Sequence, residues 1–247
     1  MVINAHLETV LKEFPNATEG NGLTEAAVNY LKKTYGFTPQ NTLFGFCTCP
    51  DEINRTVTRF MSYYGDKQFP LGGLAGYPFT GKTGFSAFSH HAPDNGNLVI
   101  LYGPHVGIAQ NGELGKVLRE NQSHESSACG AAIAFLKKYN QSKSKGELCN
   151  PQDDALDMQQ CHIEKKLLPF AEQILGAENQ IKKLVEVNYR LIEKELLEII
   201  KELAHHFKGK IALMGGIMIN TKHSQPSYFD LKRAEIYING QAERLKL

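Results

Sequence analysis

Short apolar segments alternate along the chain with longer segments of helical periodicity, and this alternation is the strongest constraint on the fold. Strand-like runs are expected at 42–48, 97–102, 210–221 and 228–239. Helical spacing is expected at 5–14, 23–35, 51–64, 127–139 and, with breaks at Pro169 and Gly176, over 154–207. The alternation predicts an α/β protein with a mostly parallel central sheet flanked by helices, with the late strands as candidates for an antiparallel edge.

The composition excludes several classes of function. A formal net charge of +1 gives no field that would attract nucleic acid or an anionic membrane surface. No apolar run approaches the ~20 residues of a membrane span, and the N-terminus lacks the features of a signal peptide. The five cysteines do not form a disulfide framework, so we expect a soluble protein in a reducing compartment: the cytoplasm, or an organelle stroma if a transit peptide was removed.

The first strand-like run ends in residues that can carry chemistry. Cys49 follows this run, and Pro50, Asp51 and Arg55 come soon after it. A thiolate is a soft metal ligand, and a carboxylate with a guanidinium beside it would supply the acid–base chemistry that a catalytic zinc site requires. The motif therefore indicates a metal site rather than an inert buried thiol.

Two further candidate ligands lie at the ends of predicted elements. His105 follows the strand 97–102, and Cys129 lies at the start of the helix 127–139. The three residues are tens of positions apart, unlike the paired ligands of a zinc finger. Because α/β proteins build sites at the carboxyl ends of strands and at helix N-termini, we predict that Cys49, His105 and Cys129 bind Zn²⁺, with one position left open.

Asp51 and Arg55 are four residues apart and would share a helix face if the helix starts near Pro50. We predict that they form a catalytic dyad, in which Arg55 holds the Asp51 carboxylate ionised and away from the metal. The alternative is a surface ion pair of small energetic value.

Other motifs give rival interpretations. His90, His91 and His124 are rival ligands, and His90 or His91 is also a candidate for passing a proton to solvent. The segment 65–84 is rich in glycine and proline and is expected to be a long loop. It contains P-loop spacing, but Pro78 removes an amide donor that a phosphate cradle uses, so no cofactor-binding motif besides the metal site is predicted.

Four motifs in combination resemble the limiting-CO2-inducible protein B/C family. They are CPDEINR at 49–55, GFSAFSHH at 84–91, YGPHVG at 102–107 and ACGA at 128–131, and ALMGGIMINT at 212–221 looks like the C-terminal strand of that family. The family is similar to β-carbonic anhydrases in fold and zinc site. The resemblance implies Cys49, His105 and Cys129 as zinc ligands, Asp51 and Arg55 as the dyad, and a homodimer.

The function implied by this resemblance is a zinc-dependent carbonic anhydrase, a lyase that hydrates CO2 reversibly to bicarbonate by zinc-bound hydroxide. Phenylalanines 44, 46, 79, 85 and 88 are candidates for lining an apolar CO2 pocket. The alternative is a non-catalytic, zinc-stabilised component of a CO2-handling complex, with the charged region 154–207 as its interaction surface. A zinc hydrolase acting on another small substrate is a third, weaker interpretation.

The domain organisation follows from these assignments. We expect a single α/β zinc domain over residues 1–247. It would consist of N-terminal helices at 1–40, a zinc-site core at 41–140, a helical region at 154–207 and C-terminal strands at 210–240.

Overall fold

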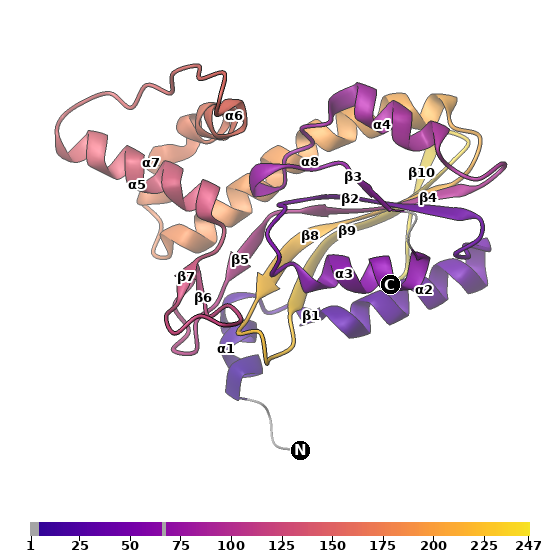
Figure 1. Ribbon diagram of the computed structural model, residues 1–247, viewed down its shortest axis with the longest axis horizontal. Coiled ribbons are helices and arrows are strands. Elements are labelled where there is room, and N and C mark those ends of the chain that lie inside the picture. Colours follow the sequence, from indigo (N-terminus) through magenta and orange to yellow (C-terminus); the bar gives the residue numbers. More distant parts are fainter. Residues whose placement is uncertain (1–4, 66–67) are drawn as a thin grey trace.

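The structure, a computed structural model, describes residues 5–65 and 68–247. Its main feature is a sheet with the strand order β1-β9-β8-β4-β2-β3, with β5 beside β8 and β10 beside β9 (Figure 1). The strands are β1 (Thr18–Glu19), β2 (Thr42–Thr48), β3 (Gln68–Pro70), β4 (Asn97–Gly103), β5 (His105–Gly107), β8 (Ile211–Asn220), β9 (Tyr228–Ile238) and β10 (Gln241–Arg244). A small second sheet pairs β6 (Lys116–Val117) with β7 (Ser126–Ser127).

The strand directions confirm the predicted sheet. Strand β2 pairs in parallel with β3 and β4, and β8 pairs in parallel with β4 and β5. Strand β9 is antiparallel to each of its neighbours, β1, β8 and β10. The protein is therefore α/β with a parallel centre, and its late strands form an antiparallel edge.

Helices cover both faces of the sheet. In Figure 1, α2 (Gly20–Tyr35) and α3 (Arg55–Tyr64) lie below it, whereas α4 (Gly81–His90) and α8 (Gln180–His206) lie above it. The helices α5 (Gly130–Ser144), α6 (Met158–Leu167) and α7 (Ala171–Leu175) form a group at the left of the view, and α1 (Ala5–Glu13) lies below them. Short 3-10 turns occur at η1 (Leu74–Gly76) and η2 (Leu168–Phe170). No helix in the described part of the chain is both long and apolar enough to cross a membrane.

The hydrophobic core divides into two clusters, one on each face of the sheet. All seven residues of β4 are buried, as expected for a central parallel strand that is covered on both sides. On the α2–α3 side, Phe44 packs with Phe60 and Tyr64. On the other side, Phe85 and Phe88 of α4 pack in the cluster that also contains Cys49 and Cys129.

The helix α8 shows how local sequence builds this second face. Asn179 is its N-cap, and the side chain of Asn179 accepts a hydrogen bond of 3.1 Å from the backbone N–H of Lys182. The buried residues of α8 recur at helical spacing and include Leu184, Asn188, Ile192, Leu196, Ile200 and Leu203. One buried stripe thus runs along the whole helix and fixes its N-terminal half beside the predicted metal ligands.

Several predicted element boundaries are shifted, and one of these shifts changes the site. The helix expected over 51–64 begins only at Arg55, because the residues before it form a turn. In that turn the Asp51 side chain accepts a hydrogen bond from the backbone N–H of Ile53 (3.4 Å), and the Asn54 side chain donates to the Cys49 carbonyl (2.9 Å). The loop expected over 65–84 is also shorter, because α4 starts at Gly81.

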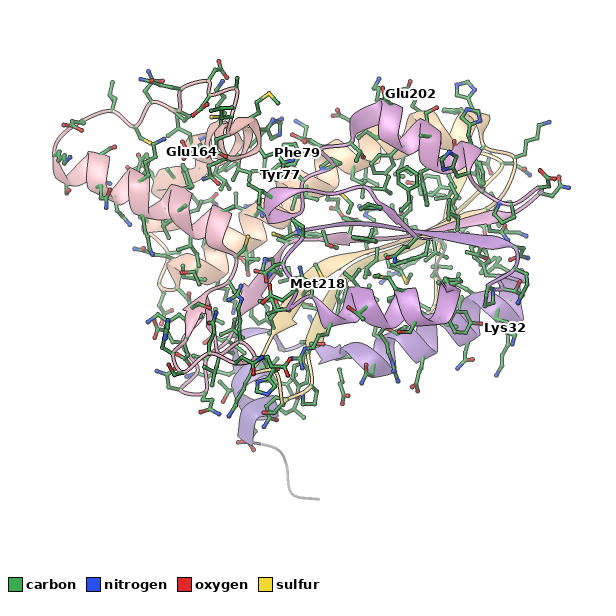
Figure 2. The ribbon with its side chains drawn as sticks, viewed as in Figure 1. Lys32, Tyr77, Phe79, Glu164, Glu202 and Met218 are labelled. Carbon is green, nitrogen blue, oxygen red and sulfur yellow. The ribbon has the colours of Figure 1, made fainter. Side chains whose placement is uncertain are left out.

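The junction between β4 and β5 requires a glycine. Gly103 has a φ of +139°, and a Cβ atom there would lie 1.8 Å from the carbonyl oxygen of Gly216. This close approach lets the chain turn at Gly103 and pair again with β8, in a register that sets His105 opposite Met218. Figure 2 marks Met218 near the end of β8, on the side of the sheet that faces the α5–α7 group.

Candidate metal centre

Three side chains that are far apart in the sequence meet at the carboxyl ends of the parallel strands. Cys49 follows β2, His105 begins β5 and Cys129 is the N-cap of α5. One ligand atom from each residue lies within 4.8 Å of the others, and all three residues are buried. Among the described residues, these three side chains form the one group that could hold a metal ion. The structure thus brings together the three predicted ligands.

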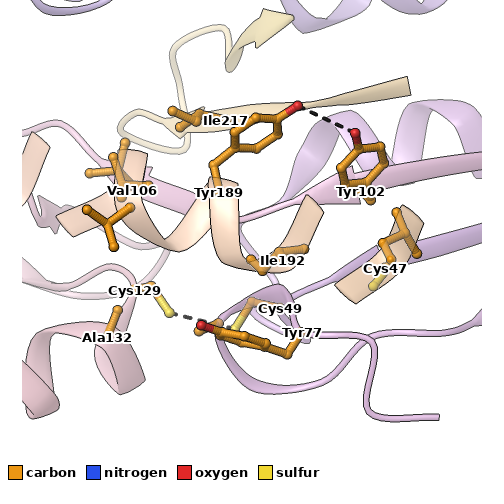
Figure 3. Close-up of a cluster of buried hydrophobic side chains, with 14 of the residues drawn as sticks. Cys47, Cys49, Tyr77, Tyr102, Val106, Cys129, Ala132, Tyr189, Ile192 and Ile217 are labelled. Carbon is orange, nitrogen blue, oxygen red and sulfur yellow. Dashed lines mark hydrogen bonds between the residues drawn. The ribbon is translucent and has the colours of Figure 1, made fainter. Parts of the chain in front are cut away.

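The distances suit zinc. The sulfurs of Cys49 and Cys129 are 3.9 Å apart (Figure 3). Two thiolates at about 2.3 Å from a tetrahedral zinc ion would be roughly 3.8 Å apart. The Nε2 atom of His105 is buried and has no hydrogen-bond partner among the described residues, which would be costly unless this nitrogen has another ligand.

The protonation of the three groups is coupled. The hydrogen bond with Cys49 and the nearby His105 hold the pKa of the Cys129 thiol well below its usual value. The same hydrogen bond, together with burial, raises the pKa of Cys49. Burial lowers the pKa of His105, but the charge and hydrogen bond of Cys129, the Asp51 carboxylate and the hydrogen bond with Asn220 together raise that pKa by more. Without metal the group thus favours one thiolate and one thiol, and a metal ion that binds both sulfurs must displace the remaining proton.

Asp51 lies next to the three ligands. Its Oδ2 atom is 3.7 Å from Nε2 of His105, and its side chain is 12% exposed. The guanidinium of Arg119 donates to the same Oδ2 atom at 2.7 Å. Arg119 also donates to Glu52 on the outer side and to Ser126 of β7, so it is held from three directions.

The predicted pairing of Asp51 with Arg55 is therefore wrong. Arg55 lies in the first turn of α3, and its guanidinium donates to the carbonyl oxygens of Thr221, His223 and Gln225. Asp51 belongs to the preceding turn and does not share a helix face with Arg55. Arg119 takes the position beside the carboxylate that was assigned to Arg55.

Two buried asparagines surround the ligands, and both are 1% exposed. Asn220 ends β8, and its Oδ1 atom is 2.8 Å from Nδ1 of His105. Asn188 of α8 donates to the carbonyl oxygen of Ala75 at 3.1 Å. Ala75 has a φ of +55°, a conformation that disfavours residues other than glycine, and its backbone N–H donates to the Cys49 sulfur. The two asparagines thus support two of the three ligands from behind.

A narrow apolar cavity adjoins the ligands. It offers about 10 Å³ to the centre of a water-sized molecule and is lined by His105, Cys129, Asn188 and aliphatic side chains, among them Val106, Ile133 and Leu184. Its wall is therefore not made of the phenylalanines that were predicted to line a pocket. Phe85 and Phe88 lie in the core beneath α4, and Phe44 lies in the cluster on the other face of the sheet.

The rival histidines lie elsewhere. His90 and His206 line a separate cavity between α4 and the end of α8. Asn188, at the metal centre, is eighteen residues before His206, which corresponds to about 27 Å along the helix. Figure 2 marks Glu202, which lines the same cavity as His90, far from Met218. The ring of His91 packs against that of Phe69, and His124 is exposed in the loop before β7.

Sequence reasoning missed Arg119, Asn220 and Asn188. Asn220 is the last residue of an apolar strand. The expectation that functional residues lie at the carboxyl ends of strands, which identified Cys49 and His105, therefore also applies to Asn220. Arg119 and Asn188 carry no such signal. Arg119 is 68 positions away from Asp51, and Asn188 is one polar residue on a long helix.

The fold and this centre define a class: an α/β protein with a buried Cys–His–Cys group where its parallel strands end. The family model for limiting CO2-inducible proteins B/C, beta carbonic anhydrases, matches residues 20–238. The chain belongs to this family. No curated protein sequence matches the chain.

Solved structures agree with this assignment. The crystal structure of PtLCIB4, a homolog of the limiting CO2-inducible protein LCIB, is 33% identical, with a TM-score of 0.88 over 98% of this chain and 100% of that chain. LCIB itself is 20% identical, with a TM-score of 0.74 over 98% of this chain and 99% of that chain, and so it shares the fold. A tetrameric β-carbonic anhydrase from Sordaria macrospora is 11% identical, with a TM-score of 0.43 over 92% of this chain and 94% of that chain, a likeness too slight to carry an argument.

Proposed function

We propose that this protein is a zinc-dependent carbonic anhydrase that converts CO2 and water reversibly to bicarbonate. The observation that carries the proposal is the convergence of Cys49, His105 and Cys129 beside the Asp51 carboxylate. These three residues would hold the metal. Zinc bound there would supply hydroxide near neutral pH, because it lowers the pKa of a coordinated water.

The side chains around the ligands support this chemistry. Asp51 can accept a hydrogen bond from a water or hydroxide beside the ligands and so orient it toward CO2. Arg119 keeps the carboxylate ionised through charge and a direct hydrogen bond. The aliphatic lining of the cavity suits an apolar molecule such as CO2.

Arg119 has a second effect, because it binds the carboxylate oxygen that lies nearest to the ligands. Oδ2 of Asp51 is 2.7 Å from Arg119 and 3.7 Å from Nε2 of His105. An arginine and a metal ion would compete for this oxygen. While Arg119 holds it, the fourth metal position stays available to water.

The same geometry favours one alternative: a zinc-stabilised component of a CO2-handling complex with no activity of its own. If Asp51 moved onto the metal, it would take the place of the water. The small size of the adjoining cavity is consistent with such a closed site.

The first test is CO2 hydration by stopped flow on protein whose zinc content is measured in the same sample. We expect about one zinc per chain and turnover that rises with pH between about 7 and 9. Zinc at that level with no turnover in this range would favour the closed alternative. The absence of bound zinc would contradict both.

Matched arginine variants test the assigned pair. Arg119→Leu should lower turnover about ten- to hundredfold without loss of zinc, because Asp51 is then free to approach the metal. Arg55→Leu is the control, because it removes contacts to the 221–225 loop and leaves the Asp51–Arg119 pair intact. A larger loss of turnover in Arg55→Leu would contradict the assignment.

The partner and compartment are also proposals. We propose a homodimer, in line with the family resemblance, and light scattering would test it. The large apolar side chains of Leu148, Leu156 and Met158 are 95%, 98% and 69% exposed and are candidates for burial between subunits. The thiols of Cys49 and Cys129 must stay reduced to bind zinc, which supports a reducing compartment.

A further inference from the structure

Asn220 links the metal centre to the turn that carries Asp51. It is the last residue of β8, and its side-chain amide lies between the His105 ring and the backbone of the 50–54 turn. The Nδ2 atom donates to the carbonyl oxygen of Ile53 at 2.7 Å, and the Oδ1 atom is 2.8 Å from Nδ1 of His105. Both groups of one buried amide are thus engaged in short contacts.

The contact with Ile53 fixes which way the amide faces. A backbone carbonyl only accepts hydrogen bonds, so the amide atom beside it must be the nitrogen. The oxygen of the amide then has to face the histidine. The orientation of Asn220 therefore follows from its surroundings, although the two ends of an amide have nearly the same shape.

The orientation of the amide in turn decides where His105 carries its proton. The amide oxygen only accepts hydrogen bonds, so Nδ1 of His105 has to be the donor. In the other neutral tautomer, two lone pairs would face each other across 2.8 Å inside a buried pocket. With the proton on Nδ1, the neutral ring has a free lone pair on Nε2.

That lone pair lies where a metal would need it. Nε2 is the ring atom without a hydrogen-bond partner among the described residues, and it faces Asp51 at 3.7 Å. A histidine binds metal through a deprotonated nitrogen, and the hydrogen bond made by its other nitrogen selects which one is deprotonated.

We propose that Asn220 is a positioning residue, which holds His105 in its Nδ1–H tautomer with Nε2 prepared for the metal. Through Ile53 it also sets the turn that carries Asp51 against the same ligand. The assignment of the tautomer does not depend on the proposed function. Its effect on metal affinity rests on zinc being the ion bound.

The test combines a spectroscopic signature with zinc affinity. Long-range ¹H–¹⁵N spectra of ¹⁵N-histidine-labelled protein report which ring nitrogen carries the proton. They would be recorded with zinc bound, and also without metal at a pH where the ring is neutral. Zinc affinity would be measured by competition with a chelator. We expect the Nδ1–H form in the wild-type protein.

Three variants separate positioning from a general structural role. Asn220→Leu removes the acceptor, and we expect a mixture of tautomers and a zinc affinity about 10- to 100-fold lower. Asn220→Asp keeps an acceptor at Nδ1 but loses the donor to the Ile53 carbonyl, so the tautomer should persist and the affinity should fall less than in Asn220→Leu. Asn54→Ala is the control: it removes a different clamp on the same turn, at the Cys49 carbonyl, and should leave the His105 spectrum unchanged.

Three results would overturn the proposal: an Nε2–H ring in the wild-type protein, an unchanged tautomer and zinc affinity in Asn220→Leu, or an equal loss of affinity in Asn54→Ala. If Asn220→Leu does not fold, the wild-type spectrum and the spectrum of Asn220→Asp still test the proposed tautomer. If the wild-type protein binds no zinc, the proposed function fails, while the metal-free spectrum still supports or overturns the tautomer.

Discussion

Two polar groups contain residues of the same core cluster, and they differ in whether their polar atoms find partners within the protein. In the first, which we call the tyrosine–glutamate cluster, Tyr102, Tyr189 and Arg233 all donate to Oε1 of Glu193, at 2.8, 2.5 and 2.8 Å. In the second, the metal centre, Nε2 of His105 has no hydrogen-bond partner in the described part of the chain. The first group is complete without a ligand, and the second is not.

For these two groups, the difference distinguishes a group that stabilises the fold from a group that is proposed to bind a metal. A buried polar group without a partner costs free energy, and a fold retains it when a ligand compensates that cost. Tyr102 and Tyr189 belong to the same core cluster as Cys49 and Cys129, and Figure 3 draws all four residues together. The burial of their residues alone would not distinguish the metal centre from the tyrosine–glutamate cluster.

The largest expected effect breaks the metal centre itself. Cys129→Ser replaces a soft sulfur ligand, so we expect zinc per chain to fall from about one to near zero, with loss of turnover. Cys47→Ser is the control, because this buried cysteine lies two residues from a ligand but donates to the carbonyl of Gly76. Metal analysis and stopped flow on both variants make the comparison, and equal loss of zinc in Cys47→Ser would speak against the assignment.

The next effect concerns the carboxylate. Asp51→Ala should lower turnover by about 10²- to 10⁴-fold while zinc stays bound, because this carboxylate is assigned to proton handling and not to binding the metal. Glu52→Ala offers a close control: it contacts the same Arg119, but its side chain is 71% exposed. Full activity in Asp51→Ala would exclude the proposed role.

The tyrosine–glutamate cluster should respond in the opposite way. Glu193→Gln weakens three hydrogen bonds to one carboxylate oxygen, and we expect a loss of about 1–3 kcal/mol in the free energy of unfolding. Zinc content and turnover per folded molecule should not change. Denaturant unfolding and activity measured together test this, and a variant with normal stability and reduced zinc would reverse the comparison.

The smallest effect is a pH dependence of that same cluster. Burial raises the pKa of Glu193, but hydrogen bonds from Arg233, Tyr189 and Tyr102 lower it by more, so the net pKa lies below the usual 4.5. A lowered pKa in the folded state means that the stabilisation is complete above about pH 4.5 and is lost as the pH falls through the folded value. The stability gap between wild type and Glu193→Gln should therefore narrow below about pH 4.5. A gap that widens on acidification would contradict this sign.

The sequence was a good guide wherever position along an element decides function. Cys49, His105 and Cys129 were found because each lies at the end of a strand or the start of a helix, and in a parallel sheet those ends meet. The parallel centre and the antiparallel edge were likewise predictable from the order of strands and helices.

Prediction from the sequence failed where another interaction overrode a local rule, and where no local rule exists. Pro50 suggested an early helix start, but the side chains of Asp51 and Asn54 bind the backbone of the turn and delay the helix to Arg55. That shift removed the expected Asp51–Arg55 pair. The actual partner, Arg119, is brought in by the fold from another part of the chain and has no pattern of its own.

The wide spacing of the three ligands has a consequence for the order of events in the cell. No two of them are neighbours in an unfolded chain, so tight zinc binding has to wait until β2 has paired with β4, β4 and β5 have paired with β8, and α5 is in place. Zinc binding is then a late step of folding, and a misfolded chain would bind no zinc. The fraction of chains that carry zinc would therefore report the fraction that had reached the native state.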